Sequence, residues 1–193
     1  SEGELRLAVC GPCFALTYSM PYDLPPQSFA IPLDALRQCE GTKNEPLQFE
    51  RQDGAVLARW TDGGIPQQAR FDTVENLDLP PLPETSIANP PSLLAALVAA
   101  SETAADDTSR YALTCLRLRG DGQLAATDGR QLLIQRGFEF PWEGDVLVPA
   151  SRVFGCKDVR CGEPLNIGRT EDWVTITSGP WTIQLKIEKE GRF

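Results

Sequence analysis

The stretch LAATDGRQL, from Leu124 to Leu132, determines how the rest of the chain can be interpreted. It contains a short apolar run, a Thr-Asp-Gly turn, and the start of a second run that continues to Gln135. Asp-Gly between two apolar runs is a strong β-hairpin signal, because glycine accepts the positive φ that such turns require. The sequence therefore predicts a hairpin centred on Asp128 and Gly129.

The length and composition are those of a globular protein. At 193 residues, of which 41% are hydrophobic, the chain has room for one large domain or two of about 100 residues. Its longest apolar run, Leu93–Ala100, is much shorter than the roughly 18 residues that a membrane span requires. No signal-peptide pattern is present at the start, so we expect a cytoplasmic protein.

The charged and titratable residues argue against catalysis. The chain has no histidine, which excludes a Ser-His-Asp or Cys-His centre and a histidine-ligated metal within it. No spaced carboxylate pair and no glycine-rich phosphate loop is evident. We therefore predict no enzyme, no catalytic residue, no metal and no cofactor. The net charge of −9 also argues against nucleic-acid binding by the whole surface.

Two of the six cysteines lie in a Cys10-Gly11-Pro12-Cys13 motif, which is similar to the redox motif of thioredoxins. In that motif a helix N-terminus lowers the pKa of the first thiol. Here the next residues, 14–20, favour a strand and end at Pro21. A thiol-disulfide oxidoreductase that uses Cys10 and Cys13 remains an alternative function. The number of cysteines also allows a zinc site with four thiolate ligands, Cys10, Cys13, Cys156 and Cys161. The spacing within the first pair differs from the spacing within the second pair, which argues against such a site.

The sequence repeats itself at an offset of about 117 residues. The corresponding segments are 29–32 with 146–149, 45–49 with 163–167, and 56–60 with 174–177. In each repeat a strand ends at a proline and a short helix follows, over 33–39 and 150–156. Three short strands come next in both repeats. The offset places the Cys10–Cys13 motif in a hairpin turn, opposite residues 127–130, and the counterpart of 89–119 is expected before Ser1.

A proline-rich connector, Leu77–Glu84, separates the repeats. After it, Asn89 is expected to cap a helix over Pro90–Ala105 whose apolar stripe faces the core. A strand is then expected over Arg110–Leu118, leading into the hairpin. We predict two domains, an incomplete first domain over 1–84 and a second domain over 85–193.

Four elements together resemble a known family. Arg110–Leu113, the hairpin, Asp145–Pro149 and Glu190–Phe193 occur in the order and at the spacing of the middle domain of the bacterial sliding clamp, the DNA polymerase III β subunit. The resemblance covers Asn89–Phe193 and, more weakly, Glu4–Glu84. It implies an α+β DNA-clamp fold, built from repeated modules of a helix and an antiparallel sheet. In that family three such domains form a subunit, and two subunits close head to tail around duplex DNA, so we expect a homo-oligomer in a full-length form.

The resemblance also implies a pocket for clamp-binding peptides of polymerase or clamp-loader type. An exposed leucine pair beside a polar turn agrees with a peptide site, which needs an apolar slot and a few orienting hydrogen bonds. An ordinary solvated hairpin is the alternative. The positions that match the second-domain half of the family's pocket are Leu113, Thr127, Gly129, Arg130, Gln131 and Leu132.

Contact with DNA is supported by few residues. Sliding on DNA requires Lys and Arg on the helices that face the phosphates. The expected helix over Pro90–Ala105 has neither and carries Glu102, and the family's basic pair after the strand-ending proline is Ala150-Ser151 here. The remaining DNA-facing candidates are Arg37, Arg152, Lys157 and Arg160.

The resulting hypothesis is a non-catalytic, sliding-clamp-like processivity factor that holds replication or repair partners on duplex DNA. The alternative from a different class is a diverged clamp-fold module that binds proteins and does not bind DNA.

Overall fold

The computed structural model describes residues 3–23, 27–39, 45–74, 77–106, 111–159 and 164–189. They belong to two compact units, one of Ser1–Gly3 and Asp23–Asp78, the other of Glu4–Tyr22 and Leu79–Phe193. This division differs from the predicted domains 1–84 and 85–193, because residues 4–22 and 79–84 join the second unit. The assignment of these segments to two repeats remains a prediction.

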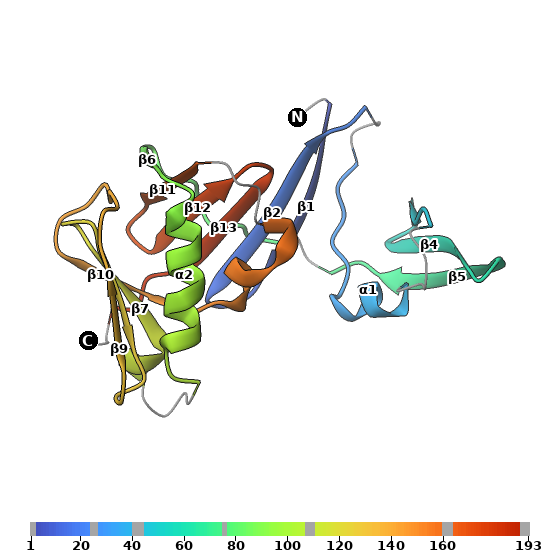
Figure 1. Ribbon diagram of the computed structural model, residues 1–193. Coiled ribbons are helices and arrows are strands. Elements are labelled where there is room, and N and C mark those ends of the chain that lie inside the picture. The colour runs from blue at the N-terminus through green and yellow to red at the C-terminus, as the bar shows by residue number, and fades with distance from the viewer. Residues whose placement is uncertain are drawn as a thin grey trace. The chain divides into compact units, whose positions relative to one another are not determined.

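The first unit has a short helix followed by three antiparallel strands (Figure 1). These are α1 (Asp34–Gln38), β3 (Gln48–Gln52), β4 (Ala55–Asp62) and β5 (Ile65–Asp72). Gly63 and Gly64 both have positive φ and form the tight turn between β4 and β5. A small core of Ala35, Ala58 and Phe71 holds α1 to the sheet. The predicted helix over 33–39 is therefore present.

The second unit contains a six-stranded sheet that joins distant parts of the sequence. Its order is β1 (Glu4–Cys10), β2 (Phe14–Pro21), β13 (Trp181–Lys186), β12 (Trp173–Ser178), β11 (Leu165–Arg169) and β6 (Ser86–Asn89), with every neighbouring pair antiparallel. The N-terminal hairpin β1–β2 thus pairs directly with the strand β13, near the other end of the chain.

A four-stranded antiparallel sheet completes the second unit. Its order is β10 (Asp145–Pro149), β7 (Cys115–Arg119), β8 (Gln123–Thr127) and β9 (Leu132–Gln135). The β8–β9 pair is the hairpin that the sequence predicts around Asp128. The edge strand β9 alternates strictly, because Leu133 packs on the core while Leu132 and Ile134 point to solvent.

The helix α2 (Ser92–Thr103) supplies the centre of the second unit's core (Figure 1). Leu93, Leu97 and Ala100 are fully buried and belong to one cluster with side chains from both sheets, such as Leu116 and Ile167. Burial of a leucine side chain contributes about 1.5–3 kcal/mol relative to leaving it exposed. The predicted apolar stripe is therefore a core-facing stripe. No helix in the described part of the chain is long and apolar enough to cross a membrane.

Asn89 does not cap α2, contrary to the sequence prediction. The residue before the helix is Pro91, and no side-chain cap hydrogen bond forms there. Asn89 instead ends β6 and bridges to the backbone of Glu139, since its Nδ2 donates to the carbonyl at 2.8 Å and its Oδ1 accepts from the N–H at 2.9 Å. The side chain is almost completely buried, so these bonds satisfy polar groups that water cannot reach.

Two further elements differ from the prediction. The expected strand over Arg110–Leu118 begins only at Cys115, because Tyr111–Thr114 forms a 3₁₀ turn, η1. The expected helix over 150–156 is a single 3₁₀ turn, η2 (Arg152–Gly155), and a second one, η3 (Lys157–Val159), follows it. Pro149 ends the strand as expected, and Ser151 caps η2 by accepting from the N–H of Val153 at 3.4 Å.

The proline-rich connector is held on the six-stranded sheet by one buried amide. Gln184 Nε2 donates to the carbonyls of Pro80 and Pro81, at 3.2 Å each, and lies 3.4 Å from Thr175 Oγ1. Gln184 is only 2% exposed, so its side chain has no access to competing water.

The Asn89 bridge gives a direct stability prediction. Asn89→Ala leaves the buried backbone groups of Glu139 without these partners, so we expect the free energy of unfolding to fall by about 1–3 kcal/mol. Glu139→Ala is the matched control, because the bridge uses only the Glu139 backbone and its side chain is exposed. Urea unfolding followed by circular dichroism measures both. Equal losses in the two variants would contradict the bridge.

Candidate partner-binding hairpin and the helix face

The turn between β8 and β9 is fixed by hydrogen bonds within its own residues. Thr127 Oγ1 accepts from the N–H of Gly129 at 3.0 Å and donates to the carbonyl of Gln131 at 2.6 Å. Asp128 Oδ1 accepts from the N–H groups of Arg130 and Gln131, at 2.8 Å each. Gly129 has φ +87°, a conformation that strains other residues. The turn is therefore held by its own half-buried Thr127 and Asp128 side chains, while Arg130 and Gln131 are exposed.

The carboxylate of Asp128 is stabilised by this arrangement. Its pKa lies below the usual value for Asp, chiefly because the backbone N–H of Gln131 and then that of Arg130 donate to the ionised form. The Arg130 charge makes a smaller contribution in the same direction. The turn therefore carries a negative charge beside two adjacent polar side chains, Arg130 and Gln131.

The structure places all six predicted pocket residues in the second unit. Thr127 ends β8, Leu132 begins β9, and Gly129, Arg130 and Gln131 form the turn between them. Leu113 lies in η1, which packs beside β7 and β8, and is half-buried. Leu132 is 60% exposed, so a large apolar side chain is available next to the rigid turn.

Sequence reasoning missed Ile134, which is 47% exposed on the same side of β9 as Leu132. The alternation of the strand was the available signal, because residues two apart share a face. Leu132 and Ile134 together give β9 an apolar outer face.

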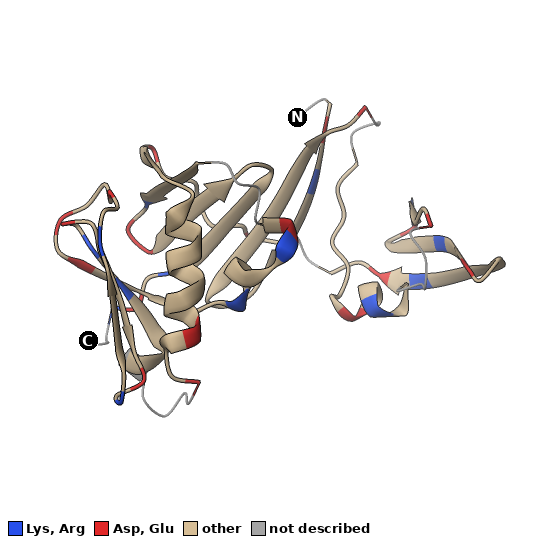
Figure 2. Ribbon diagram, viewed as in Figure 1, with Lys and Arg blue, Asp and Glu red and all other residues tan. Residues whose placement is uncertain are grey.

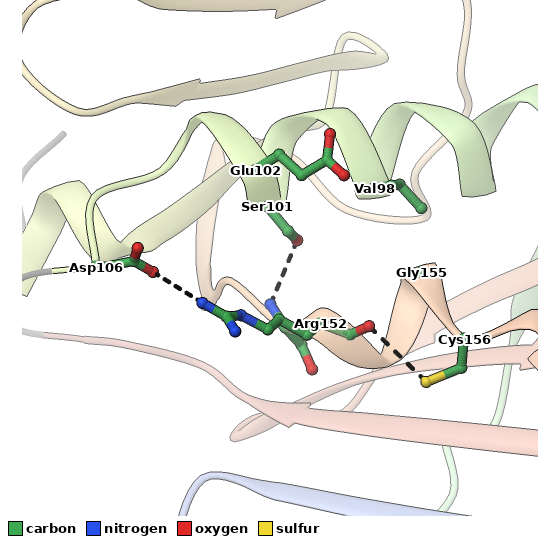
Figure 3. A pocket seen from close by; sticks show the side chains of 8 residues that line it. Val98, Ser101, Glu102, Asp106, Arg152, Gly155 and Cys156 are labelled. Carbon is green, nitrogen blue, oxygen red and sulfur yellow. Dashed lines mark hydrogen bonds and ion pairs between the residues drawn. The ribbon is translucent and has the colours of Figure 1, made fainter.

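A groove of about 540 Å³ lies between α2 and η2 (Figure 3). Polar contacts cross it: the N–H of Ser151 donates to Ser101 Oγ at 3.3 Å, and Arg152 lies 3.8 Å from Asp106. Its lining residues are Val98, Ser101, Glu102, Asp106, Ser151, Arg152, Gly155 and Cys156. Two carboxylates and one guanidinium line the groove, so it offers little attraction for a phosphate group.

The predicted DNA-facing side chains are few, and two of them lie near carboxylates on the surface. Arg152 is paired with Asp106, and Arg37, on α1 of the first unit, lies 3.4 Å from Asp34. Lys157 is exposed on η3, and Arg160 lies outside the described residues. Figure 2 shows no Lys or Arg on α2, whose exposed end carries Glu102. Arg152 and Lys157 therefore lie on the successive turns η2 and η3, and the helix α2 itself has no positive charge.

The Cys10–Cys13 motif lies in a turn between strands, as the repeat predicts. β1 ends at Cys10 and β2 begins at Phe14, and the N–H of Gly11 donates to the Phe14 carbonyl at 2.8 Å. No helix follows Cys13, so the helix N-terminus that activates thioredoxin thiols is missing from this motif. Of the other cysteines, Cys161 lies outside the described residues, and burial raises the pKa of the Cys39 and Cys115 thiols. Within the described residues, no three metal-binding side chains gather.

The Asp128 carboxylate gives a prediction for pH dependence. Its pKa in the folded chain should lie below the value of about 3.9 found in unfolded peptides. The stabilisation is then fully present above the unfolded value and is lost as the pH falls through the folded pKa. Carbon-detected NMR titration of the folded and the urea-unfolded chain measures both values. A folded value equal to or above the unfolded one would contradict the turn geometry.

Neither a protein-family model nor a curated protein sequence matches this chain. Among solved structures, it resembles a DNA polymerase III β sliding clamp from Pseudomonas aeruginosa bound to griselimycin, with a TM-score of 0.76 and 17% identity. A second structure of the DNA polymerase III β subunit from the same organism gives a TM-score of 0.72 and 18% identity.

Both matches cover 100% of this chain and 56% of the matched chain, so this chain spans about half the length of those proteins. The α+β architecture of antiparallel sheets with few helices agrees with them throughout. The similarity extends over both compact units. This chain has the sliding-clamp fold of the DNA polymerase III β subunit.

Proposed function

We propose that this chain is a non-catalytic, sliding-clamp-like protein that holds replication or repair partners on duplex DNA in the cytoplasm. The observation that supports it most is the match of the whole chain to sliding clamps at TM-scores of 0.71–0.76. A sliding clamp holds its partners in place and catalyses no reaction, which is consistent with a chain that contains no histidine.

The partner-binding residues in this proposal are those of the β8–β9 hairpin and η1. A peptide would place an apolar side chain against Leu132 and Leu113, and the turn would orient it through Arg130 and Gln131. Because Asp128 and Thr127 hold the turn without help from a ligand, little conformational entropy is lost when a peptide binds. We propose peptides of polymerase or clamp-loader type as partners.

A second candidate function is a clamp-fold module that binds proteins but not DNA. The specific observation in its favour is the charge of the α2 face, where Glu102 is present, Lys and Arg are missing from the helix, and Arg152 is paired with Asp106. Phosphate contacts supply most non-specific DNA affinity, so a face with this charge contributes little.

Peptide binding can be tested at Leu132. Leu132→Ala removes apolar contact area worth about 1–2 kcal/mol, so we expect a labelled clamp-binding peptide to bind roughly 5- to 30-fold more weakly. Fluorescence anisotropy measures the dissociation constant. Leu82→Ala is the matched control, because Leu82 is 66% exposed and lies on the connector, outside the hairpin. An unchanged affinity in Leu132→Ala would refute this site.

DNA binding can be tested by charge reversal. If Arg152 and Lys157 meet phosphates, the double variant Arg152→Glu/Lys157→Glu should weaken duplex binding and reduce the slope of log affinity against log salt by about 2. Arg169→Glu, an exposed charge on β11, is the control. Electrophoretic mobility shifts over a salt series measure the effect. No binding by the wild-type chain at low salt would favour the protein-binding module instead.

A further inference from the structure

The chain contains four Asp-Gly dipeptides, at residues 53–54, 62–63, 121–122 and 128–129. An aspartate before glycine is prone to isomerise, because glycine has no Cβ to shield its backbone nitrogen from the neighbouring carboxyl group. The reaction requires a glycine N–H that is not held in a hydrogen bond and a carboxyl group that can turn toward it. The four dipeptides differ in both respects.

Both reacting groups are engaged at the dipeptide between β7 and β8. The N–H of Gly122 donates to the Arg119 carbonyl at 2.9 Å. Asp121 Oδ1 accepts from the N–H of Gln123 at 3.2 Å, and Asp121 Oδ2 lies 3.2 Å from the Arg119 guanidinium. These contacts must break before the Gly122 nitrogen can attack the carboxyl group, so the fold protects this dipeptide.

Two further dipeptides are also held by the fold. In the β8–β9 turn the N–H of Gly129 donates to Thr127 Oγ1, and Asp128 Oδ1 accepts from two other backbone N–H groups. In the β4–β5 turn Asp62 is the last residue of β4 and pairs with Ile65, so the ladder holds its backbone in the extended conformation.

The β3–β4 turn lacks this protection. Gln52 pairs with Ala55, so Asp53 and Gly54 are the two loop residues, and both are exposed. Within the residues that the structure describes, no hydrogen bond engages the Asp53 carboxylate or the Gly54 N–H. Asp53 has φ +40° and is the one residue other than glycine with a positive φ in the described part of the chain. This conformation strains a residue that has a Cβ, so opening the turn releases strain at Asp53.

We propose that Asp53 is a modification site at which the folded chain isomerises to isoaspartate. The Gly54 nitrogen bonds to the carbon of the protonated Asp53 carboxyl group, and the Gly54 proton leaves with the carboxyl hydroxyl group as water, which closes a succinimide ring. Water then adds to the ring at the former backbone carbonyl of Asp53, and the bond from that carbon to the Gly54 nitrogen breaks. The backbone now runs through the former side chain, and the atomic composition is unchanged.

The modification changes the hairpin because it adds one carbon to the backbone between Asp53 and Gly54. The Gly54 carbonyl accepts two hydrogen bonds from Thr73, one from its N–H at 3.2 Å and one from its Oγ1 at 2.8 Å. Thr73 directly follows β5, so these bonds tie the β3–β4 turn to the end of β5. Isoaspartate at residue 53 therefore weakens the three-stranded sheet of the first unit. The inference is independent of the proposed function.

The first test follows isoaspartate in the full 193-residue chain during incubation at neutral pH. Peptide mapping by mass spectrometry locates it, with a protease that cleaves before aspartate but not before isoaspartate. We expect isoaspartate to accumulate at residue 53 before it accumulates at 62, 121 or 128. Incubation in urea that unfolds the chain is the control. Without the fold each aspartate is simply followed by glycine, so the four sites should react at similar rates.

The second test uses variants of the reacting carboxyl group. Asparagine closes the same ring faster and releases ammonia, so Asp53→Asn should accelerate the formation of isoaspartate. Asp121→Asn is the matched control and should react more slowly than Asp53→Asn, because the Gly122 N–H still donates to Arg119. Asp53→Glu should abolish the product at this position, because glutamate would have to close a less favourable six-membered ring. Circular dichroism confirms that each variant is folded.

A third variant tests the protection itself. Thr127→Val keeps the shape of the side chain but removes the acceptor of the Gly129 N–H, so isoaspartate at residue 128 should rise while residue 53 is unaffected. Three outcomes would overturn the proposal: equal rates at residues 53, 121 and 128 in the folded chain, the same order of sites in urea, or an Asp121→Asn variant that reacts as fast as Asp53→Asn. Peptide and DNA binding are measured separately, so their loss would leave this inference standing.

Discussion

The ladder between β2 and β13 is the interaction on which the second unit depends. It closes a loop of more than 150 residues and places the Cys10–Cys13 turn beside the end of β13, where Lys186 donates to the Cys13 carbonyl. Forming a contact between such distant residues has a large cost in loop-closure entropy, although this cost grows only slowly with loop length. The ladder offsets it by burying Ile183 and Leu185, which belong to the same core cluster as the buried residues of α2.

The same architecture explains why the candidate site lies on the β8–β9 hairpin. The helix α2 packs against one face of the four-stranded sheet, where Leu116 belongs to the shared core. This packing fixes the position of β9. Internal bonds from Thr127 and Asp128 then fix the turn. A rigid scaffold with an exposed apolar strand at its edge can bind a peptide without rearranging. The acidic α2 face, by contrast, provides no comparable site for phosphate.

Local sequence signals predicted the elements that local interactions determine. Asp128-Gly129 indicated the hairpin because the turn chemistry is contained within a few residues, and the repeat placed the Cys10–Cys13 motif in a turn. Asn89 was assigned wrongly as a helix cap, because its true partner, Glu139, is 50 residues away. The 3₁₀ turn at Arg152 contacts α2, and the short strand β6 pairs with β11, so both also depend on segments far away in the sequence. Of the site, the turn could be predicted from its own residues, and Ile134 could have been predicted from strand alternation once Leu132 was taken as exposed.

Hydrogen exchange at the β2–β13 ladder tests the central claim most directly. We expect the amides of Ser19 and Lys186, which donate across this ladder, to exchange as slowly as amides in the interior of the six-stranded sheet. Amides on the outer side of β5, which lies at an edge of the three-stranded sheet in the described residues, should exchange faster. Fast exchange at Ser19 and Lys186 under native conditions would show that the N-terminal hairpin is not part of this sheet, and would contradict the account.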